Sequence, residues 1–207
     1  EFGFNILQIE STAACNMACS FCPYPLKNDK TTKMNLDDIK IIINQIDPND
    51  RNFRYVTFSQ FNEPLLDNRI FELIEYVQSK GLKVLMITNG LLLNKKKNVD
   101  ELIRLKPDLK ISLQVIEDNK LDERGLNLEM ENYAKTIFDF CLKIKDTDLK
   151  TTIDIGNQYN NSSLKYYLKK ILGISTGDPS VPKSTNETLN KFKFFVEKLN
   201  QLDKNFI

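Results

Sequence analysis

The chain contains no histidine among its 207 residues. Imidazole is the commonest general base in enzymes and a very common metal ligand. Its absence excludes Ser-His-Asp hydrolases, Cys-His proteases and zinc hydrolases that hold their metal through histidine. Any chemistry of this protein must use sulfur, carboxylate, hydroxyl or amine groups, or a cofactor.

The chain also lacks long apolar runs and an excess of charge of either sign. No stretch approaches the roughly 20 apolar residues that a membrane helix needs, and no basic start followed by an apolar core marks a signal peptide. The 29 basic and 28 acidic side chains nearly cancel, so nothing indicates a nucleic-acid or membrane-surface partner. We therefore expect a cytoplasmic protein. Because it begins at Glu1 without a methionine, we also expect it to be part of a longer chain.

Short β-like runs alternate with longer segments of helical spacing, which predicts one α/β domain with a parallel sheet. The predicted strands are residues 5–10, 54–59, 83–88, 109–114 and 150–155. The predicted helices are residues 35–46, capped by Asn35, and residues 67–80, 100–105 and 129–145. A weaker pattern favours helices at 163–171 and 185–202 and a sixth strand at 171–175. An incompletely closed barrel and a doubly wound sheet both fit this alternation, and both gather ligands at the carboxyl ends of the strands.

Three of the four cysteines, Cys15, Cys19 and Cys22, lie in the segment CNMACSFC directly after the first predicted strand. Three thiols this close together favour a soft metal or a cluster over a disulfide. A zinc site would need a fourth ligand, and the remaining thiol, Cys141, falls on a predicted helix beside Phe138 and is expected in the core. Three buried thiols without a metal and a zinc site both remain alternatives.

The spacing C-x3-C-x2-C, with the aromatic Phe21 before the third cysteine, resembles the radical S-adenosylmethionine (radical SAM) superfamily. The resemblance implies a partial (β/α)6 barrel and a 4Fe-4S cluster bound by Cys15, Cys19 and Cys22. It also implies that S-adenosylmethionine chelates the fourth iron and that Phe21 belongs to the cofactor site. Reductive cleavage of the cofactor would then give a 5′-deoxyadenosyl radical that abstracts hydrogen from a substrate.

The ends of the second and third predicted strands agree with this resemblance. Residues 59–64 read SQFNEP and are similar to the family's GGEP segment, which implies that Glu63 binds the cofactor amino group. Phe61 and Asn62 stand where the two glycines usually are, and the same segment could simply start the next helix. Asn89 lies in a TNG sequence that resembles the family's ribose and methionine contact, although Asn-Gly is also common turn chemistry.

The fourth strand end supplies three further candidates. Ser112 and Gln114 alternate along the strand and so lie on one face, where they would bond the ribose or carboxylate of the cofactor. Arg124 follows twelve residues after Ser112, near the place where the family has an arginine that pairs with the cofactor carboxylate. A surface arginine before a glycine turn is the alternative for Arg124.

The resemblance covers residues 6–157, so residues 1–160 are assigned to the radical SAM core and residues 161–207 to a segment that completes the same domain. No cysteine follows Cys141, so the cysteine-rich extension of SPASM-type members is absent or was removed. Residues 22–25, with Met34, are similar to members that modify peptides or sugars. We rank peptide or protein modification first and carbohydrate or other small-molecule chemistry second, with flavodoxin or ferredoxin as electron donor. A non-catalytic iron-sulfur or zinc-binding module is the alternative of another class.

Overall fold

The computed structural model describes residues 4–19, 22–113 and 130–155. All five predicted strands are confirmed, and each pairs in parallel with at least one neighbour. Four of the predicted helices are confirmed as well, and three short 3-10 helices accompany them. The predicted elements at 163–171, 171–175 and 185–202 lie outside the described residues. The strands are β1 (Ile6–Gln8), β2 (Tyr55–Thr57), β3 (Leu85–Thr88), β4 (Asp108–Leu113) and β5 (Thr151–Ile155).

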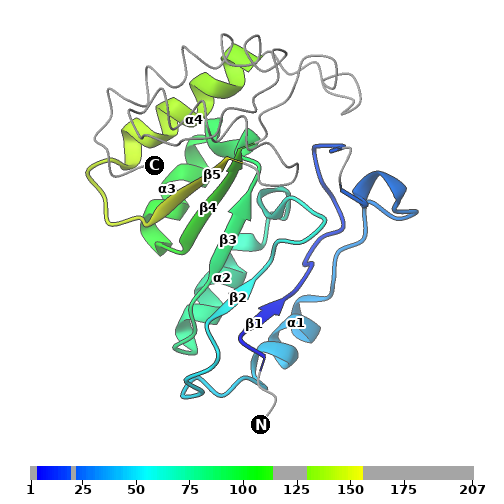
Figure 1. Cartoon of the computed structure of the whole chain (residues 1–207). Coiled ribbons are helices and arrows are strands. Elements are labelled where there is room, and N and C mark those ends of the chain that lie inside the picture. The colour runs from blue at the N-terminus through cyan, green and yellow to red at the C-terminus, as the bar shows by residue number, and fades with distance from the viewer. Residues whose placement is uncertain (1–3, 20–21, 114–129, 156–207) are drawn as a thin grey trace, which may run out of the picture.

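The strands follow one another across the sheet in chain order (Figure 1). β1 pairs with β2, and β3 pairs with β4 and β5. A single parallel bridge between Val56 and Val84 joins the two groups, and the Val56 amide donates to the Lys83 carbonyl at 2.9 Å. A doubly wound sheet reverses its strand order at a switch point, whereas a barrel adds each strand on the same side. The observed order therefore favours the barrel.

Features of the local sequence explain where the helices begin. They are α1 (Leu36–Ile43), α2 (Ile70–Ser79), α3 (Lys96–Leu105) and α4 (Met130–Ile144). The side chain of Asn35 accepts a hydrogen bond from the Asp37 amide at 2.8 Å and so caps α1 as predicted. α3 begins four residues earlier than predicted, because Val99, Leu102 and Leu105 form one buried stripe that extends the helix toward its start.

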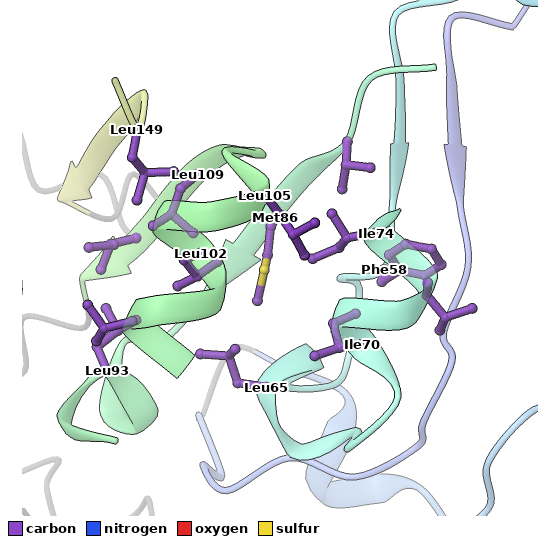
Figure 2. Packing of buried hydrophobic residues seen from close by; sticks show 14 of the residues in the cluster. Phe58, Leu65, Ile70, Ile74, Met86, Leu93, Leu102, Leu105, Leu109 and Leu149 are labelled. Atoms are coloured by element: carbon purple, nitrogen blue, oxygen red, sulfur yellow. The ribbon is translucent and has the colours of Figure 1, made fainter. Parts of the chain in front are cut away.

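The hydrophobic core lies between the strands and the helices (Figure 2). Ile74 of α2, Met86 of β3 and Leu102 of α3 are buried in it together. Cys141 of α4 is fully buried beside Phe140, which confirms its place in the core. No described helix is long and apolar enough to cross a membrane.

A buried ion pair holds the chain where β1 gives way to the cysteine segment. Asp67 is completely buried, and Arg69 donates to its two carboxylate oxygens at 2.9 Å each. Arg69 also donates to the carbonyls of Ser11 at 3.1 Å and Met34 at 2.9 Å. Because one guanidinium bonds all three residues, this arrangement ties the segment before Cys15 to the start of α2.

Candidate functional site

The cysteine loop leaves the end of β1 and carries three free thiols. Cys19 is buried, and Cys15 and Cys22 are half-buried. The Cys22 amide donates to the Cys19 carbonyl at 2.9 Å, so these two cysteines lie close together. Tyr24 then holds both ends of the motif: its hydroxyl donates to the Cys15 carbonyl at 2.9 Å, and its amide donates to the Cys22 sulfur at 3.4 Å.

Local sequence explains why Tyr24 can reach back to the motif. Prolines at 23 and 25 flank it, and residues 24–26 form a 3-10 helix, η1 (Tyr24–Leu26). Proline fixes its own backbone angle and suits the first turn of a helix, so the chain turns sharply after Cys22. Tyr24 is consequently buried against the cysteine loop, with 8% of its surface exposed.

The thiols suit a cluster with thiolate ligands. The pKa of Cys15 is raised to about 12, chiefly by burial, with smaller contributions from Glu63, Cys19 and Cys22 and against the lowering effect of a backbone hydrogen bond at Met17. A thiol with that pKa loses its proton near neutral pH only when a cation takes the proton's place, as iron does.

The spacing of the thiols also bears on the choice between one metal ion and a cluster. Across the described ranges, no three Cys, Asp or Glu side chains converge on a single metal ion. A cubane does not require such convergence, because each cysteine binds a different iron. Three free thiols within eight residues are a donor set that fits a cluster with three protein ligands.

Glu63 is the buried carboxylate of the site, with 1% of its surface exposed. One carboxylate oxygen accepts from the Thr88 hydroxyl at 2.8 Å and from the Leu65 amide at 3.1 Å, and the other accepts from the Asn89 amide at 2.9 Å. Burial raises the pKa of Glu63 to about 7, against the lowering effect of these three donors. No lysine or arginine of the described residues pairs with it.

The SQFNEP segment starts a helix, as one of its two interpretations predicts, and the binding of the cofactor amino group by Glu63 stays a prediction. Glu63 is the N-cap of η2 (Pro64–Leu66), with Pro64 in the first helical position, as a simple helix start requires. The same carboxylate faces the end of β3 through Thr88 and Asn89. The helix start therefore fixes the direction in which the carboxylate points.

Side-chain hydrogen bonds hold the segment where the family usually has two glycines. The Asn62 side chain donates to the Phe58 carbonyl at 2.9 Å and accepts from the Gln60 amide at 2.9 Å, which closes the turn on itself. The Phe61 amide donates to the Glu10 carboxylate at 2.7 Å. Asn62 thus forms hydrogen bonds within its own loop. These bonds give a local structural reason for an asparagine at a position where the family usually has glycine.

The TNG segment closes the site at the end of β3. Gly90 has φ of 81°, which favours glycine, and a β-carbon there would lie 2.4 Å from the Ile137 side chain of α4, which would have to shift. The Asn89 side chain accepts from the Leu91 amide at 3.0 Å, which is the turn chemistry expected of Asn-Gly. That Asn89 also binds the cofactor stays a prediction.

The other predicted cofactor residues are only partly described. Ser112 is half-buried on β4 opposite Asp154 in the strand pairing, and it points to the other face from the fully buried Ile111. Phe21, Gln114 and Arg124 lie outside the described residues. Their assignments, like that of Ser112, stay predictions.

Four residues of the site were missed from the sequence. Glu10 bonds Phe61 and forms an ion pair with Lys27 at 2.6 Å, and Tyr24 bonds Cys15. The Tyr133 hydroxyl of α4 donates to the Asn89 carbonyl at 2.6 Å, and Asn16 bonds the Asn89 side chain. Of these four, only Tyr24 had a signal in the sequence, namely its flanking prolines. The contacts of the other three join segments far apart in the chain, so no local pattern marks them.

Comparison with known proteins identifies the family and the fold. The family model described as "Radical SAM superfamily" matches residues 9–171. An uncharacterized protein of Methanocaldococcus jannaschii, MJ0804, is 35% identical over 110 residues, which are 52% of this chain and 32% of that protein. The chain therefore spans about a third of the curated relative that it matches.

Two solved structures share the fold at low sequence identity. A structure of anSMEcpe with bound AdoMet has a TM-score of 0.57 at 19% identity, over 99% of this chain and 62% of that one. Streptococcus suis SuiB has a TM-score of 0.57 at 18% identity, over 100% and 49%. The expected partial (β/α) barrel is thereby confirmed, and with the family match over most of its length, the chain belongs to the radical SAM superfamily.

Proposed function

We propose that this chain is the core of a radical SAM enzyme that modifies a peptide or protein. In this proposal Cys15, Cys19 and Cys22 bind three irons of the cluster, and Glu63 binds the amino group of S-adenosylmethionine. One observation carries it: three free cysteines share a site with a completely buried carboxylate that has no cationic partner among the described residues. A scaffold that only held metal would have no use for such a carboxylate.

The family's cofactors, a 4Fe-4S cluster and S-adenosylmethionine, supply a 5′-deoxyadenosyl radical when bound and reduced. The protein's own contribution is to position and to exclude water. Glu63 offers a fixed negative charge to an ammonium group, and the Leu65 and Asn89 amides hold that charge in one orientation. Because Glu63 is buried, the ion pair would form away from water, where it is stronger.

The substrate class rests on weaker support than the cofactor chemistry. Residues 22–25 and Met34 are similar to members that modify peptides or sugars, and we rank peptides first. Streptococcus suis SuiB has been solved bound to the precursor peptide SuiA, and it shares the fold with a TM-score of 0.53 at 16% identity. Small-molecule chemistry is the second candidate, because BtrN, solved in complex with AdoMet and 2-DOIA, shares the fold with a TM-score of 0.51 at 19% identity.

An electron donor belongs to the proposal, since the cluster must be reduced before the cofactor is cleaved. We propose a flavodoxin or a ferredoxin, and a cytoplasmic setting in which such carriers act. The domain assignment of residues 1–160 and 161–207 is part of the same proposal.

The test is anaerobic reconstitution of the cluster, reduction with dithionite in the presence of S-adenosylmethionine, and measurement of 5′-deoxyadenosine. We expect the wild-type protein to produce it and a Cys19→Ala variant to produce none. Wild-type protein that holds its full complement of iron and sulfide but makes no 5′-deoxyadenosine would support a non-catalytic module instead. Adding peptide or sugar substrates and scoring which one accelerates the product then separates the two substrate classes.

A further inference from the structure

Asn16, the residue after Cys15, bonds a residue at the end of β3. Its side-chain oxygen accepts a hydrogen bond from the Asn89 side-chain amide at 2.8 Å, across 73 residues of sequence. Both side chains are half-buried in the site. This hydrogen bond joins the cysteine motif to the TNG turn and belongs to neither of them alone.

The orientation of both amides follows from their neighbours. The Asn89 side-chain oxygen accepts from the Leu91 amide at 3.0 Å, so turning the amide over would set its NH2 group against another donor. The Asn89 NH2 group must then point toward Asn16, and Asn16 must present its oxygen. The pairing is therefore specific in direction and does not depend on an arbitrary choice of amide orientation.

Asn89 is joined to the carboxylate as well as to the cysteine loop. Its backbone amide donates to Glu63 at 2.9 Å, and its carbonyl accepts from the Tyr133 hydroxyl at 2.6 Å. A shift of Asn89 would thus disturb Glu63 and α4 together. Asn16 therefore bonds a residue that is itself held by Glu63 and by Tyr133.

Cys15 lies between two such links. On one side the Ala14 carbonyl accepts from the Glu63 amide at 2.9 Å, and on the other Asn16 bonds Asn89. Both links lead to the same carboxylate, one through its backbone and one through the Asn89 amide that it binds. The separation between the Cys15 loop and the Glu63 carboxylate is therefore set from both sides of the cysteine.

We propose that Asn16 is a positioning residue that acts through Asn89. The bridge between them fixes the cysteine loop relative to Glu63, so that one S-adenosylmethionine would reach both the open iron of a cluster held in part by Cys15 and the Glu63 carboxylate that takes its ammonium group. This inference rests on the proposed function, because a bidentate cofactor is what makes that separation matter. Asn16 itself needs no contact with the cofactor for this role.

The test is a double-mutant cycle on the affinity for S-adenosylmethionine, with Asn16→Ala, Asn89→Ser and the double variant. A serine hydroxyl can still cap the Leu91 amide but is too short to reach Asn16. Affinity is measured by anaerobic calorimetry on cluster-loaded protein, together with iron and sulfide content. The spectroscopic readout is the change that S-adenosylmethionine causes in the electron paramagnetic resonance spectrum of the reduced cluster.

We expect Asn16→Ala to raise the Kd about tenfold in the wild-type background, the effect of losing one half-buried hydrogen bond, and to change it little in the Asn89→Ser background. Iron content should stay at the wild-type level. Asn28→Ala, an exposed asparagine shortly after the cysteine motif, is the matched control and should leave the Kd unchanged. Equal tenfold effects in both backgrounds, or no effect in either, would overturn the proposal.

Two other outcomes are separable. If wild-type protein with a full cluster shows neither binding nor a spectral change, the proposed cofactor site fails and the bridge has nothing to position. If the Asn16→Ala variant does not hold its cluster, the Asn16→Asp variant is measured in its place, because aspartate keeps an acceptor oxygen in the same position. Cluster loss in both variants would assign Asn16 to cluster assembly and overturn the positioning role.

Discussion

Replacing Glu63 by glutamine tests the charge at the centre of the site. The change keeps the shape of the side chain and removes its negative charge. A hydrogen bond to a charged partner contributes about 1.5–3 kcal/mol, so we expect the Kd for S-adenosylmethionine to rise about 10- to 150-fold near neutral pH. Glu63 has 1% of its surface exposed. The upper part of the range applies if the ion pair with the ammonium group forms at this buried carboxylate, away from water.

The pH dependence is a stricter test than the affinity at one pH. Burial raises the pKa of Glu63 to about 7, and the ammonium group binds the ionised form. Affinity should therefore rise with pH up to 7 and level off above it. Between about pH 5.5 and pH 7.5 the ionised fraction grows from roughly 3% to roughly 76%, which predicts about a 25-fold gain in affinity. The glutamine variant has no such group and should show a flat profile.

Anaerobic calorimetry over this range measures both effects, with iron content determined for every sample. The titration stays below about pH 7.5 because an α-amino group begins to lose its proton near there. Glu72→Gln is the matched control, because it makes the same chemical change at an exposed glutamate of α2. Glu72 forms a surface ion pair with Lys40 at 3.1 Å, and its replacement should leave the affinity unchanged. If the variant and the wild type lose affinity equally on acidification, Glu63 is not the group that binds the ammonium.

Two pairs of substitutions test the cluster ligands and the fold around them. Cys19→Ala should abolish the visible absorbance of the reconstituted cluster, whereas Cys141→Ala, in the core, should leave it intact; equal loss in both would reassign Cys141. Gly81→Ala and Gly90→Ala both place a β-carbon at positive φ, which costs about 1 kcal/mol. Only Gly90→Ala also meets the Ile137 side chain, so thermal unfolding should show it to be less stable than Gly81→Ala by about 1–3 kcal/mol, and equal losses would mean that α4 does not pack there.

The spacing of the cysteines and the alternation of strands could be read without a structure. Both are local: three thiols within eight residues must lie near one another, and apolar periodicity repeats over one element at a time. The order of the βα units then determined which segments end at the same edge of the sheet. For this reason Glu63 and Asn89 could be predicted to share a site before any contact between them was known.

Only the tertiary structure decided how those groups are held. Asn16 and Tyr133 have the same local propensities wherever they occur, and nothing near them in the chain marks them as partners of Asn89. Their contacts depend on distances across 73 and 44 residues of sequence, which follow from the packing of whole elements. The sequence by itself thus determined which chemistry the site contains, and the packing decided the direction of each polar group within it, because a hydrogen bond depends on distance and angle in space.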